Sequence, residues 1–385
     1  MSFDSFNLHP CILANVYASG YKTPTPIQSQ SIPTILLGKD MMGLAQTGTG
    51  KTAAFTLPII QRLITGPRSC VRALIVAPTR ELAQQIHDTF VRLCHGTGLR
   101  SMTLYGGINI NSQIKKLESG VEIVVACPGR LLDHVQQKTI NLSKVDMLVL
   151  DEADQMLDMG FLPSIRRILT HLPKKRQTLL FSATMAYAID ELAYEVLHEP
   201  VTVKIGHSAP AVSVKHALFP VASHLKSRLL IKILHKTNIE SVLVFTRTKH
   251  GAKQVAGKLE EAGFRATSLQ GNLSQNKRQS AMNGFRDGTV QILVATDIAS
   301  RGIDVSAISH VINYDIPDTV EAYIHRIGRT GRADKKGEAF TLVTHEDHDE
   351  VSNIERVLGN RLEHCKLEDF DYSAPESSRN AWRSV

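Results

Sequence analysis

The stretch AQTGTGKT, at residues 45–52, decides the fold of this 385-residue chain. An apolar segment precedes it and helix-forming residues follow it, which is the strand-to-helix setting of a phosphate-binding loop. Its glycines let backbone N–H groups curl around a phosphate, and the N-terminus of the next helix adds positive dipole. The generic pattern begins with glycine, whereas this chain has alanine there. We expect nucleotide phosphates to contact Ala45, Gln46, Thr47, Gly48, Thr49, Gly50, Lys51 and Thr52.

A run of carboxylates follows a second apolar segment, Met147–Leu150, in the order Asp151-Glu152-Ala153-Asp154. The carboxyl end of a buried strand faces the ligand crevice of a parallel sheet. We expect Asp151 and the Thr52 hydroxyl to hold Mg²⁺, while Lys51 reaches the terminal phosphates. Glu152 is then the group that polarises an attacking water. These two motifs alone indicate only a nucleotide and magnesium, because kinases and simple GTPases also have phosphate-binding loops.

Apolar, β-branched runs alternate with helix-period segments along the chain, which is typical of an α/β protein with buried, mostly parallel sheets flanked by helices. A stretch with glycine and proline separates two series of runs and predicts an inter-domain linker. The expected strands are Ala73–Ala77, Met102–Tyr105, Ile123–Ala126, Met147–Leu150, Thr178–Phe181, Val242–Phe245, Ile292–Ala295, Val311–Tyr314 and Ala339–Val343. The expected division is an N-terminal region 1–29, a first domain 30–205, a linker 206–212, a second domain 213–360 and a short tail 361–385.

Composition excludes several classes of protein. The chain has 44 Lys and Arg against 37 Asp and Glu, a net charge of +7, which suits a polyanionic partner but indicates one only weakly. No apolar run is long enough for a membrane span and no secretory signal is present, so we expect a cytoplasmic protein without a membrane partner. Five cysteines without a C-x-x-C pair argue against a disulfide framework or a zinc cluster.

Further motifs make the pattern specific. They are Pro78-Thr79-Arg80-Glu81-Leu82, Gly106-Gly107, Pro128-Gly129-Arg130, Ser182-Ala183-Thr184, Arg301-Gly302-Ile303-Asp304 and His325-Arg326-Ile327-Gly328-Arg329-Thr330-Gly331-Arg332. With Asp151–Asp154 they resemble, in content and order, the DEAD-box RNA helicases, over about residues 3–345. The short layout looks most like the bacterial RhlE-type group. The resemblance implies two tandem RecA-like domains, the first carrying the phosphate-binding loop and the carboxylates.

The resemblance also implies how ATP is bound. The segment Gly20–Gln28 resembles the Q motif, and the Gln28 amide has a donor and an acceptor that suit the N6 and N7 edge of adenine. Tyr21 offers an aromatic face near the base, and Phe3 matches the isolated upstream aromatic of the family. Asp304 matches the residue that accepts from the ribose hydroxyls. Arg329 and Arg332 match the arginine fingers that reach the γ-phosphate from the second domain.

RNA contacts are expected from exposed hydroxyls, bare backbone and guanidiniums that follow apolar strands, because such groups bind phosphates and sugars without reading bases. In the first domain these are Thr79, Arg80, Gly106, Gly107, Gly129 and Arg130. Family positions continue the track in the second domain at Thr248, Arg278, Thr296 and Asp297. Ser182, Thr184 and His325 match residues that couple the ATP and RNA sites. Cys127 and Ser300 stand where the family usually has threonine and alanine.

We therefore expect an RNA-stimulated ATPase that binds ATP, Mg²⁺ and single-stranded RNA across an inter-domain cleft. It would unwind short duplexes or remodel RNA–protein complexes, with little sequence preference. The main alternative is an ATP-gated RNA clamp or assembly platform, which uses the same motifs. A second alternative is a DNA helicase or a phosphotransferase. The adenine-reading glutamine and the paired arginines argue against a phosphotransferase, and stimulation of hydrolysis by DNA would test for a DNA helicase. Ribonucleoprotein or RNA-decay partners are compatible with the family, but the sequence identifies none.

Overall fold

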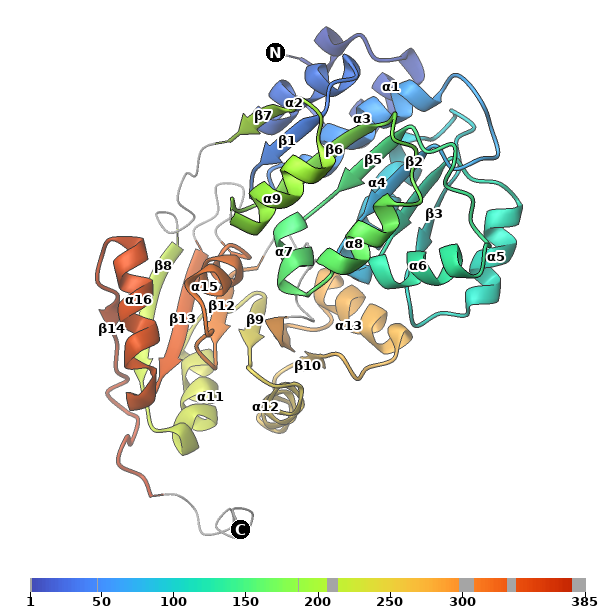
Figure 1. Cartoon of the computed structure of the whole chain (residues 1–385). Coiled ribbons are helices and arrows are strands. Elements are labelled where there is room, and N and C mark those ends of the chain that lie inside the picture. Colours follow the sequence, from blue (N-terminus) through green and yellow to red (C-terminus); the bar gives the residue numbers. More distant parts are fainter. Residues whose placement is uncertain are drawn as a thin grey trace. The chain divides into compact units, whose positions relative to one another are not determined.

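The computed structural model describes residues 2–46, 48–185, 187–205, 214–297, 308–330 and 337–375. The chain forms two compact units, Met1–His207 and Ser208–Val385, and each contains one seven-stranded sheet (Figure 1). The α/β class and the two sheets are therefore confirmed. The expected linker, 206–212, lies outside the described residues, and the expected domain bounds stay a prediction.

The first unit begins with helical segments and then alternates strands with helices. The helical segments are η1 (Phe3–Phe6), α1 (Pro10–Ala18), α2 (Pro26–Leu36), α3 (Lys51–Leu63), α4 (Arg80–Leu93), α5 (Ile110–Glu118), α6 (Pro128–Gln136), α7 (Ala153–Asp158), α8 (Leu162–Leu169) and α9 (Tyr187–Val196). The strands are β1 (Met41–Leu44), β2 (Ala73–Val76), β3 (Ser101–Leu104), β4 (Ile123–Ala126), β5 (Met147–Leu150), β6 (Gln177–Ser182) and β7 (Val201–Lys204).

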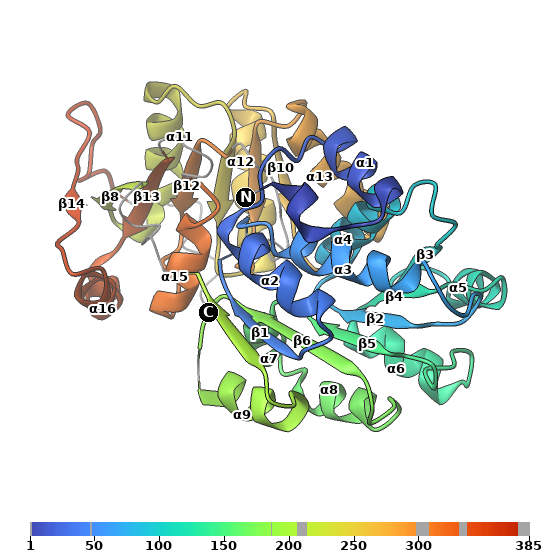
Figure 2. The same cartoon turned by 90° about the horizontal axis from the view of Figure 1, so that it is seen from above.

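All pairings in the first sheet are parallel, in the order β3-β4-β2-β5-β6-β1-β7. Alternate side chains of the central strands enter two hydrophobic clusters, one on each face of the sheet. Helices α1 to α4 pack on one face and α6 to α9 on the other (Figure 2). Because the strands are parallel, their carboxyl ends all lie along one edge, here called the carboxyl edge.

The second unit repeats this plan. Its helical segments are η2 (Ser223–Leu225), α11 (Lys226–Lys236), α12 (Lys249–Glu261), α13 (Gln275–Asp287), α15 (Val320–Ile327), η3 (His345–Asp347) and α16 (His348–Leu358). Its strands are β8 (Val214–Pro220), β9 (Val242–Phe245), β10 (Ala266–Leu269), β11 (Ile292–Ala295), β12 (His310–Asn313), β13 (Gly337–Val343) and β14 (Glu363–His364). They lie in the order β10-β11-β9-β12-β13-β8-β14. Counted from the first strand of each unit, this is the order of the first sheet.

Equivalent helices in the two units begin in the same way. Thr79 precedes α4 and its hydroxyl accepts a hydrogen bond from the Leu82 amide at 3.2 Å. Thr248 precedes α12 and accepts from the Gly251 amide at 3.0 Å. Both threonines satisfy an amide that the helix itself leaves without a partner, which is the function of an N-cap. Since β2 and β9 occupy the same place in their sheets, the two caps lie at equivalent points of the two carboxyl edges.

All nine expected strands are present, within one or two residues of the expected ends. The strand expected before the phosphate-binding loop is β1, whereas the runs that became β7, β8, β10 and β14 were not expected as strands, because they are short or partly polar. The segment after α16 belongs to the second unit at least as far as Ala374: β14 pairs with β8, and Phe370 and Tyr372 pack against the hydrophobic core. No helix in the described part of the chain is long and apolar enough to span a bilayer.

Candidate active site

The phosphate-binding loop connects β1 to α3 at the carboxyl edge of the first sheet. Gly48 and Gly50 have φ angles of +88° and +93°, which only glycine adopts without strain. The ammonium of Lys51 is buried and donates a hydrogen bond to the Ala45 carbonyl at 2.8 Å, across the loop. A lysine ammonium has three donors, so it can keep this bond and also bind phosphate oxygens. Thr47 lies outside the described residues.

Gln28 links the start of α2 to this loop. Its Oε1 accepts from the Thr25 amide at 3.0 Å, and its Nε2 donates to the Gly50 carbonyl at 3.1 Å. A Cβ at Gly50 would lie 2.5 Å from Nε2, so the contact requires glycine. Among the described residues, each amide atom keeps one unused hydrogen-bonding position, because Oε1 has a second lone pair and Nε2 a second hydrogen. Gln28 can therefore hold the loop and still read the edge of a base.

The two aromatic residues predicted for the base lie together. The rings of Phe3 and Tyr21 meet edge to face, with centroids 6.1 Å apart. Phe3 is completely buried in the core of the first unit, whereas Tyr21 is half-buried. Phe3 therefore supports Tyr21 and offers no ring surface of its own to a ligand in this structure.

The acidic residues at the end of β5 fit a cation. The carboxylate of Asp151 is only 2 % exposed, and its burial raises its pKa, while the nearby charge of Lys51 opposes that rise. Thr52 and Asp151 carry oxygen atoms, which Mg²⁺ prefers, and Mg²⁺ commonly takes its other ligands from water and phosphate. The described residues contain no group of three or more acidic, histidine or cysteine side chains that could hold a metal by themselves.

Glu152, next in the chain, has a left-handed backbone, with φ 50° and ψ 53°. This conformation costs a residue with a Cβ of order 1–2 kcal/mol, and such strain is concentrated at functional sites. Glu152 is also buried, beside Asp151, whose Oδ1 accepts from the Glu152 amide at 3.0 Å. The strained turn places the second carboxylate beside the first at the carboxyl edge.

Asp154 ties the carboxylate run to the predicted coupling segment. Its Oδ2 accepts from the amides of Ala183 and Thr184 at 3.0 and 3.1 Å. The Ser182 hydroxyl donates to the Thr184 carbonyl at 2.7 Å and closes the turn. The ends of β5 and β6 are thus joined through one buried carboxylate. A shift of either segment changes the hydrogen bonds of the other.

The predicted RNA residues of the first unit also come together. A Cβ at Gly107 would collide with Nη1 of Arg80, so the guanidinium of Arg80 lies directly against the backbone of the Gly106–Gly107 loop. Nη1 of Arg130 donates to the Ile108 carbonyl at 3.1 Å, from the other side of this loop. The Cβ position of Gly129 is open, with no atom within 4 Å. Two guanidiniums and two stretches of bare backbone therefore share the ends of β2, β3 and β4.

Among the predicted RNA residues of the second unit, Thr248 is the N-cap described above, and the others divide by exposure. Thr296 is half-buried, whereas Arg278 is 8 % exposed and donates to the Gln270 carbonyl at 3.3 Å. Asp297 forms a bidentate ion pair with Arg326, with N–O distances of 2.6 and 2.7 Å. Its carboxylate is therefore engaged inside the unit, and its predicted contact with RNA stays a prediction.

Arg326 binds several segments of the second unit that meet near the end of β11. It is 3 % exposed, donates to Asn313 Oδ1 at 3.0 Å and to the Asp315 carbonyl at 2.7 Å, and lies 4.9 Å from the ring centre of Phe245. It joins the ends of β9, β11 and β12 to α15. Two further predicted residues of this unit are described: Arg329 is buried and His325 is half-buried. Asp304, predicted for the ribose, and Arg332, predicted for the γ-phosphate, lie outside the described residues.

Comparison with known proteins agrees with this geometry. Residues 25–192 match the family model "DEAD/DEAH box helicase", and residues 225–334 match "Helicase conserved C-terminal domain". The DEAD-box ATP-dependent RNA helicase CshA of Bacillus cereus is 40 % identical over 371 residues, which are 96 % of this chain and 70 % of CshA. The chain belongs to the DEAD-box helicase family. The RhlE-type subgroup stays a prediction.

Other relatives and solved structures of the family extend the comparison. This chain is 40 % identical to the DEAD-box ATP-dependent RNA helicase RhpA of Helicobacter pylori over 366 residues, which are 94 % of this chain and 73 % of RhpA. A structure of S. cerevisiae Dbp5 bound to RNA and ADP BeF3 is 31 % identical, with a TM-score of 0.85, and covers 94 % of this chain and 95 % of that one. A DEAD box protein from Methanococcus jannaschii is 37 % identical, with a TM-score of 0.54, and covers 95 % and 99 %. The expected tandem RecA-like fold is confirmed.

Several residues of this DEAD-box site were missed from sequence. Asp154 and Arg326 stand inside quoted motifs, and their acidic or cationic side chains were the available signal. Gln113, which contacts Arg130, stands in a helix without a quoted motif, and His134, which contacts Gln113, stands in α6 four residues after the quoted Arg130. Only the three-dimensional structure shows that they lie beside Arg130, one of the predicted RNA-binding residues.

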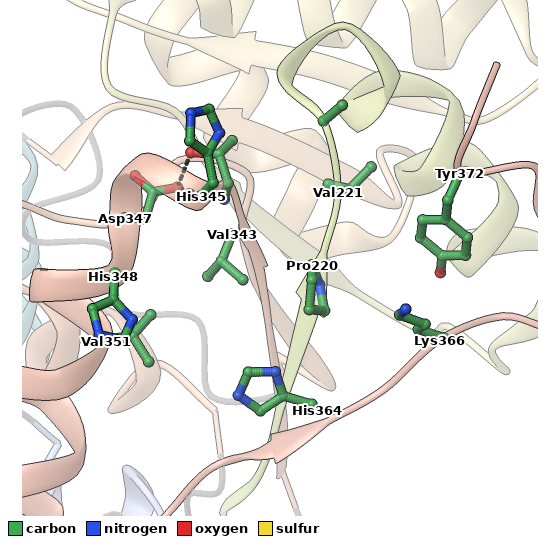
Figure 3. A pocket seen from close by; sticks show the side chains of 12 residues that line it. Pro220, Val221, Val343, His345, Asp347, His348, Val351, His364, Lys366 and Tyr372 are labelled. Atoms are coloured by element: carbon green, nitrogen blue, oxygen red, sulfur yellow. Dashed lines mark hydrogen bonds between the residues drawn. The ribbon is translucent and has the colours of Figure 1, made fainter.

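A cavity of about 480 Å³ opens at the carboxyl ends of β8 and β13 (Figure 3). Three histidines and Lys366 line it, together with apolar side chains such as Val221 and Val351. It lies outside both matched family segments and contains none of the predicted site residues.

Proposed function

We propose that this protein is an ATP-dependent RNA helicase that couples ATP hydrolysis to local unwinding of short RNA duplexes or to remodelling of RNA–protein complexes. The chain of contacts through Asp154 carries the proposal. It joins the carboxylates beside the phosphate-binding loop to Ala183 and Thr184, on a carboxyl edge where Arg80 and Arg130 also lie. Such a connection is what an ATPase controlled by nucleic acid requires.

The nucleotide half of the proposal uses the loop and the carboxylates. Backbone amides of residues 46–52 and the ammonium of Lys51 bind phosphate, and Gln28 reads adenine beside Tyr21. Thr52 and Asp151 hold Mg²⁺, which neutralises charge on the phosphates when bound. Glu152 accepts a proton from the attacking water. Arg329 and Arg332 of the second unit complete the γ-phosphate site, and Asp304 binds the ribose.

The RNA half of the proposal uses groups that grip a backbone. In the first unit, Arg80, Arg130 and the amides of Gly106, Gly107 and Gly129 bind phosphates and sugars, with Thr79 close by. The second unit continues the track from Thr248 to Thr296. Such contacts read no bases, so binding is nearly independent of sequence and weakens with salt. Ser182, Thr184 and His325 transmit the state of one ligand to the other.

Steady-state ATP hydrolysis tests the proposal. The purified protein is assayed at low salt alone, with single-stranded RNA and with DNA of the same sequence. Strong stimulation by RNA supports it, and unwinding of a duplex of about eight pairs then separates a helicase from an RNA clamp. Such a duplex has about seven base-pair steps and costs about 10 kcal/mol to open, at roughly 1.4 kcal/mol per step. Equal rates in all three reactions contradict RNA coupling, and stimulation by DNA alone points to a DNA helicase. A cytoplasmic location and ribonucleoprotein partners stay predictions.

A further inference from the structure

A buried glutamine contacts the predicted RNA-binding residues of the first unit. Gln113 lies in α5, is 3 % exposed, and belongs to no motif that the sequence singled out. Its neighbour His134, in α6, is completely buried. Buried polar side chains persist where their hydrogen bonds are satisfied, so the bonds of this pair show what it holds in place.

The amide of Gln113 is used at both ends. Its Oε1 accepts from Nη1 of Arg130 at 2.8 Å and lies 3.0 Å from Nε2 of His134. Its Nε2 donates to the Tyr105 carbonyl at 3.1 Å. Because Oε1 can only accept, the proton of a neutral His134 resides on Nε2. The Thr139 hydroxyl, 2.7 Å from Nδ1, then donates to the other ring nitrogen.

These bonds enclose the loop that follows β3. Tyr105 and Ile108 stand on either side of Gly106–Gly107, and their carbonyls are bound by Gln113 and by Arg130 respectively. Arg130 uses Nη1 for both of its hydrogen bonds, so Nη2 donates to none of the residues that the structure describes. Nε of Arg130 also lies 3.3 Å from Oδ2 of the exposed Asp133. The buried amide of Gln113 thus holds the loop backbone and, together with Asp133, the guanidinium.

The second unit has a side chain at the equivalent position. Gln113 and Arg278 each stand four residues after the N-cap of their helix, Asn109 and Ser274. Each donates to the carbonyl of the first residue after the preceding strand: Gln113 to Tyr105, and Arg278 to Gln270. The same side-chain-to-backbone hydrogen bond therefore occurs in both units, with an amide donor in the first and a guanidinium donor in the second. In both units it lies beside residues that we predict to bind RNA.

We propose that Gln113, oriented by His134, is a positioning residue that holds Arg130 and residues 105–108 in the geometry that binds the RNA backbone. The inference rests on the proposed function, since it assumes that this edge binds RNA. Gln113 is buried and acts through its neighbours. Its loss therefore releases Arg130 to other rotamers, and the entropy of fixing that side chain must then be supplied when RNA binds.

The test compares two buried glutamines of the same unit. Gln177 is also 3 % exposed; its Oε1 accepts from Arg62 at 3.1 Å, and its Nε2 donates to the Ile35 and Lys39 carbonyls at 3.0 and 2.7 Å. Methionine at either site keeps the volume and removes the hydrogen bonds. RNA-stimulated ATP hydrolysis is measured with a single-stranded oligouridine RNA, and unfolding by circular dichroism.

For Gln113→Met we expect the half-saturating RNA concentration to rise about tenfold, equivalent to about one charge-assisted hydrogen bond. The turnover number at saturating RNA and the KM for ATP stay within about twofold of wild type. Gln177→Met lowers stability to a similar degree, but its RNA half-saturation stays within about twofold. If the methionine variant does not fold, Gln113→Asn replaces it, with the same expected result, because the shorter amide cannot span Arg130 and Tyr105.

A double-mutant cycle identifies the route of the effect. In an Arg130→Met background, Gln113→Met should raise the RNA half-saturation less than it does in the wild-type background, because the guanidinium, one of the two groups that Gln113 positions, is already absent. The inference is overturned if the Gln113 and Gln177 variants behave alike, if the Gln113 effect appears equally in the KM for ATP, or if the two substitutions multiply in the cycle. A wild-type protein that RNA does not stimulate overturns the proposed function itself.

Discussion

The carboxylate of Asp154 accepts a hydrogen bond from the Thr184 amide at 3.1 Å, across a separation of thirty residues in the chain. It also accepts from Ala183, so it fixes the turn that follows β6 relative to the end of β5. Asp151, the first member of the acidic run, interacts electrostatically with Lys51 of the nucleotide loop. Asp154, the last member, binds the coupling segment at residues 183 and 184. Asp154 therefore has a different task from Asp151 and Glu152.

Replacement of Asp154 by alanine should reduce RNA stimulation of ATP hydrolysis more than ATP binding. Two part-buried amides lose their acceptor, at a cost of at most about 1–3 kcal/mol each, and the 183–184 turn is released. We expect the RNA-stimulated rate to fall at least about tenfold. Asp158→Ala, exposed on the same helix α7, is the matched control and should keep the wild-type rate. An unchanged stimulation factor in D154A would contradict a coupling role.

Lys51→Ala should abolish ATP hydrolysis. Lys51 is the buried cation of the loop, and removing a group that stabilises transferring phosphate costs at least about 10² in rate. The rate is measured at saturating RNA, with the exposed Lys39→Ala as control. Near-normal turnover would remove Lys51 from the mechanism.

Glu152→Gln should trap the complex. Glutamine has the size of glutamate but cannot accept a proton, so hydrolysis should fall by about 10²–10⁴ while ATP and RNA remain bound. Equilibrium binding of a fluorescent ATP analogue and of labelled RNA distinguishes a loss of hydrolysis alone from a loss of ligand binding. If ATP binding disappears as well, Glu152 holds the nucleotide or its metal, and the roles of the two carboxylates must be exchanged.

Gln28→Ala should weaken the preference for ATP over GTP. A bidentate contact to a base edge discriminates by about 1–3 kcal/mol, so the ratio of kcat/KM for the two nucleotides should fall at least about fivefold. Gln30, exposed on the same helix α2, supplies the control variant Gln30→Ala. Equal selectivity in both variants would show that Gln28 serves only to brace Gly50.

The first unit should lose stability in mildly acidic solution. Burial lowers the pKa of His134 below its usual value of 6.5, Arg130 lowers it further, and Asp133 opposes them. As pH falls below about 6.5, the unfolded chain takes up a proton that the folded chain does not, so the free energy of unfolding decreases. Urea unfolding at pH 7.5, 6.5 and 5.5 measures this decrease. His134→Gln should show a smaller decrease, and an equal one would contradict the prediction.

Sequence reasoning was most successful where the signal is local. The phosphate-binding loop, the acidic end of β5 and the apolar strands depend on residues close together in the chain, and they were predicted within one or two residues. Burial was not predictable in the same way. Phe3 was expected near the base but is completely buried, because Phe6 and Tyr21 pack around its ring.

Interactions between distant segments could not be predicted. Asp297 was expected to contact RNA, yet its carboxylate is engaged by Arg326, which α15 brings back to the end of β11. Gln113 has an ordinary polar side chain in an amphipathic helix, and nothing in its neighbourhood in the sequence distinguishes it from a solvated residue. Only the packing of α5 against α6 shows that its amide is buried.

The two sheets share one strand order, so the helix that follows the first strand of each unit can be compared. Lys51 is the first residue of α3, after β1, and Lys226 is the first residue of α11, after β8. Both ammoniums are buried, but Lys226 is bound to Asp315, at 3.3 Å, beside the Tyr314 ring. In the second unit an internal ion pair thus neutralises the buried ammonium at the start of the helix, so this cation is already engaged by a carboxylate of its own unit.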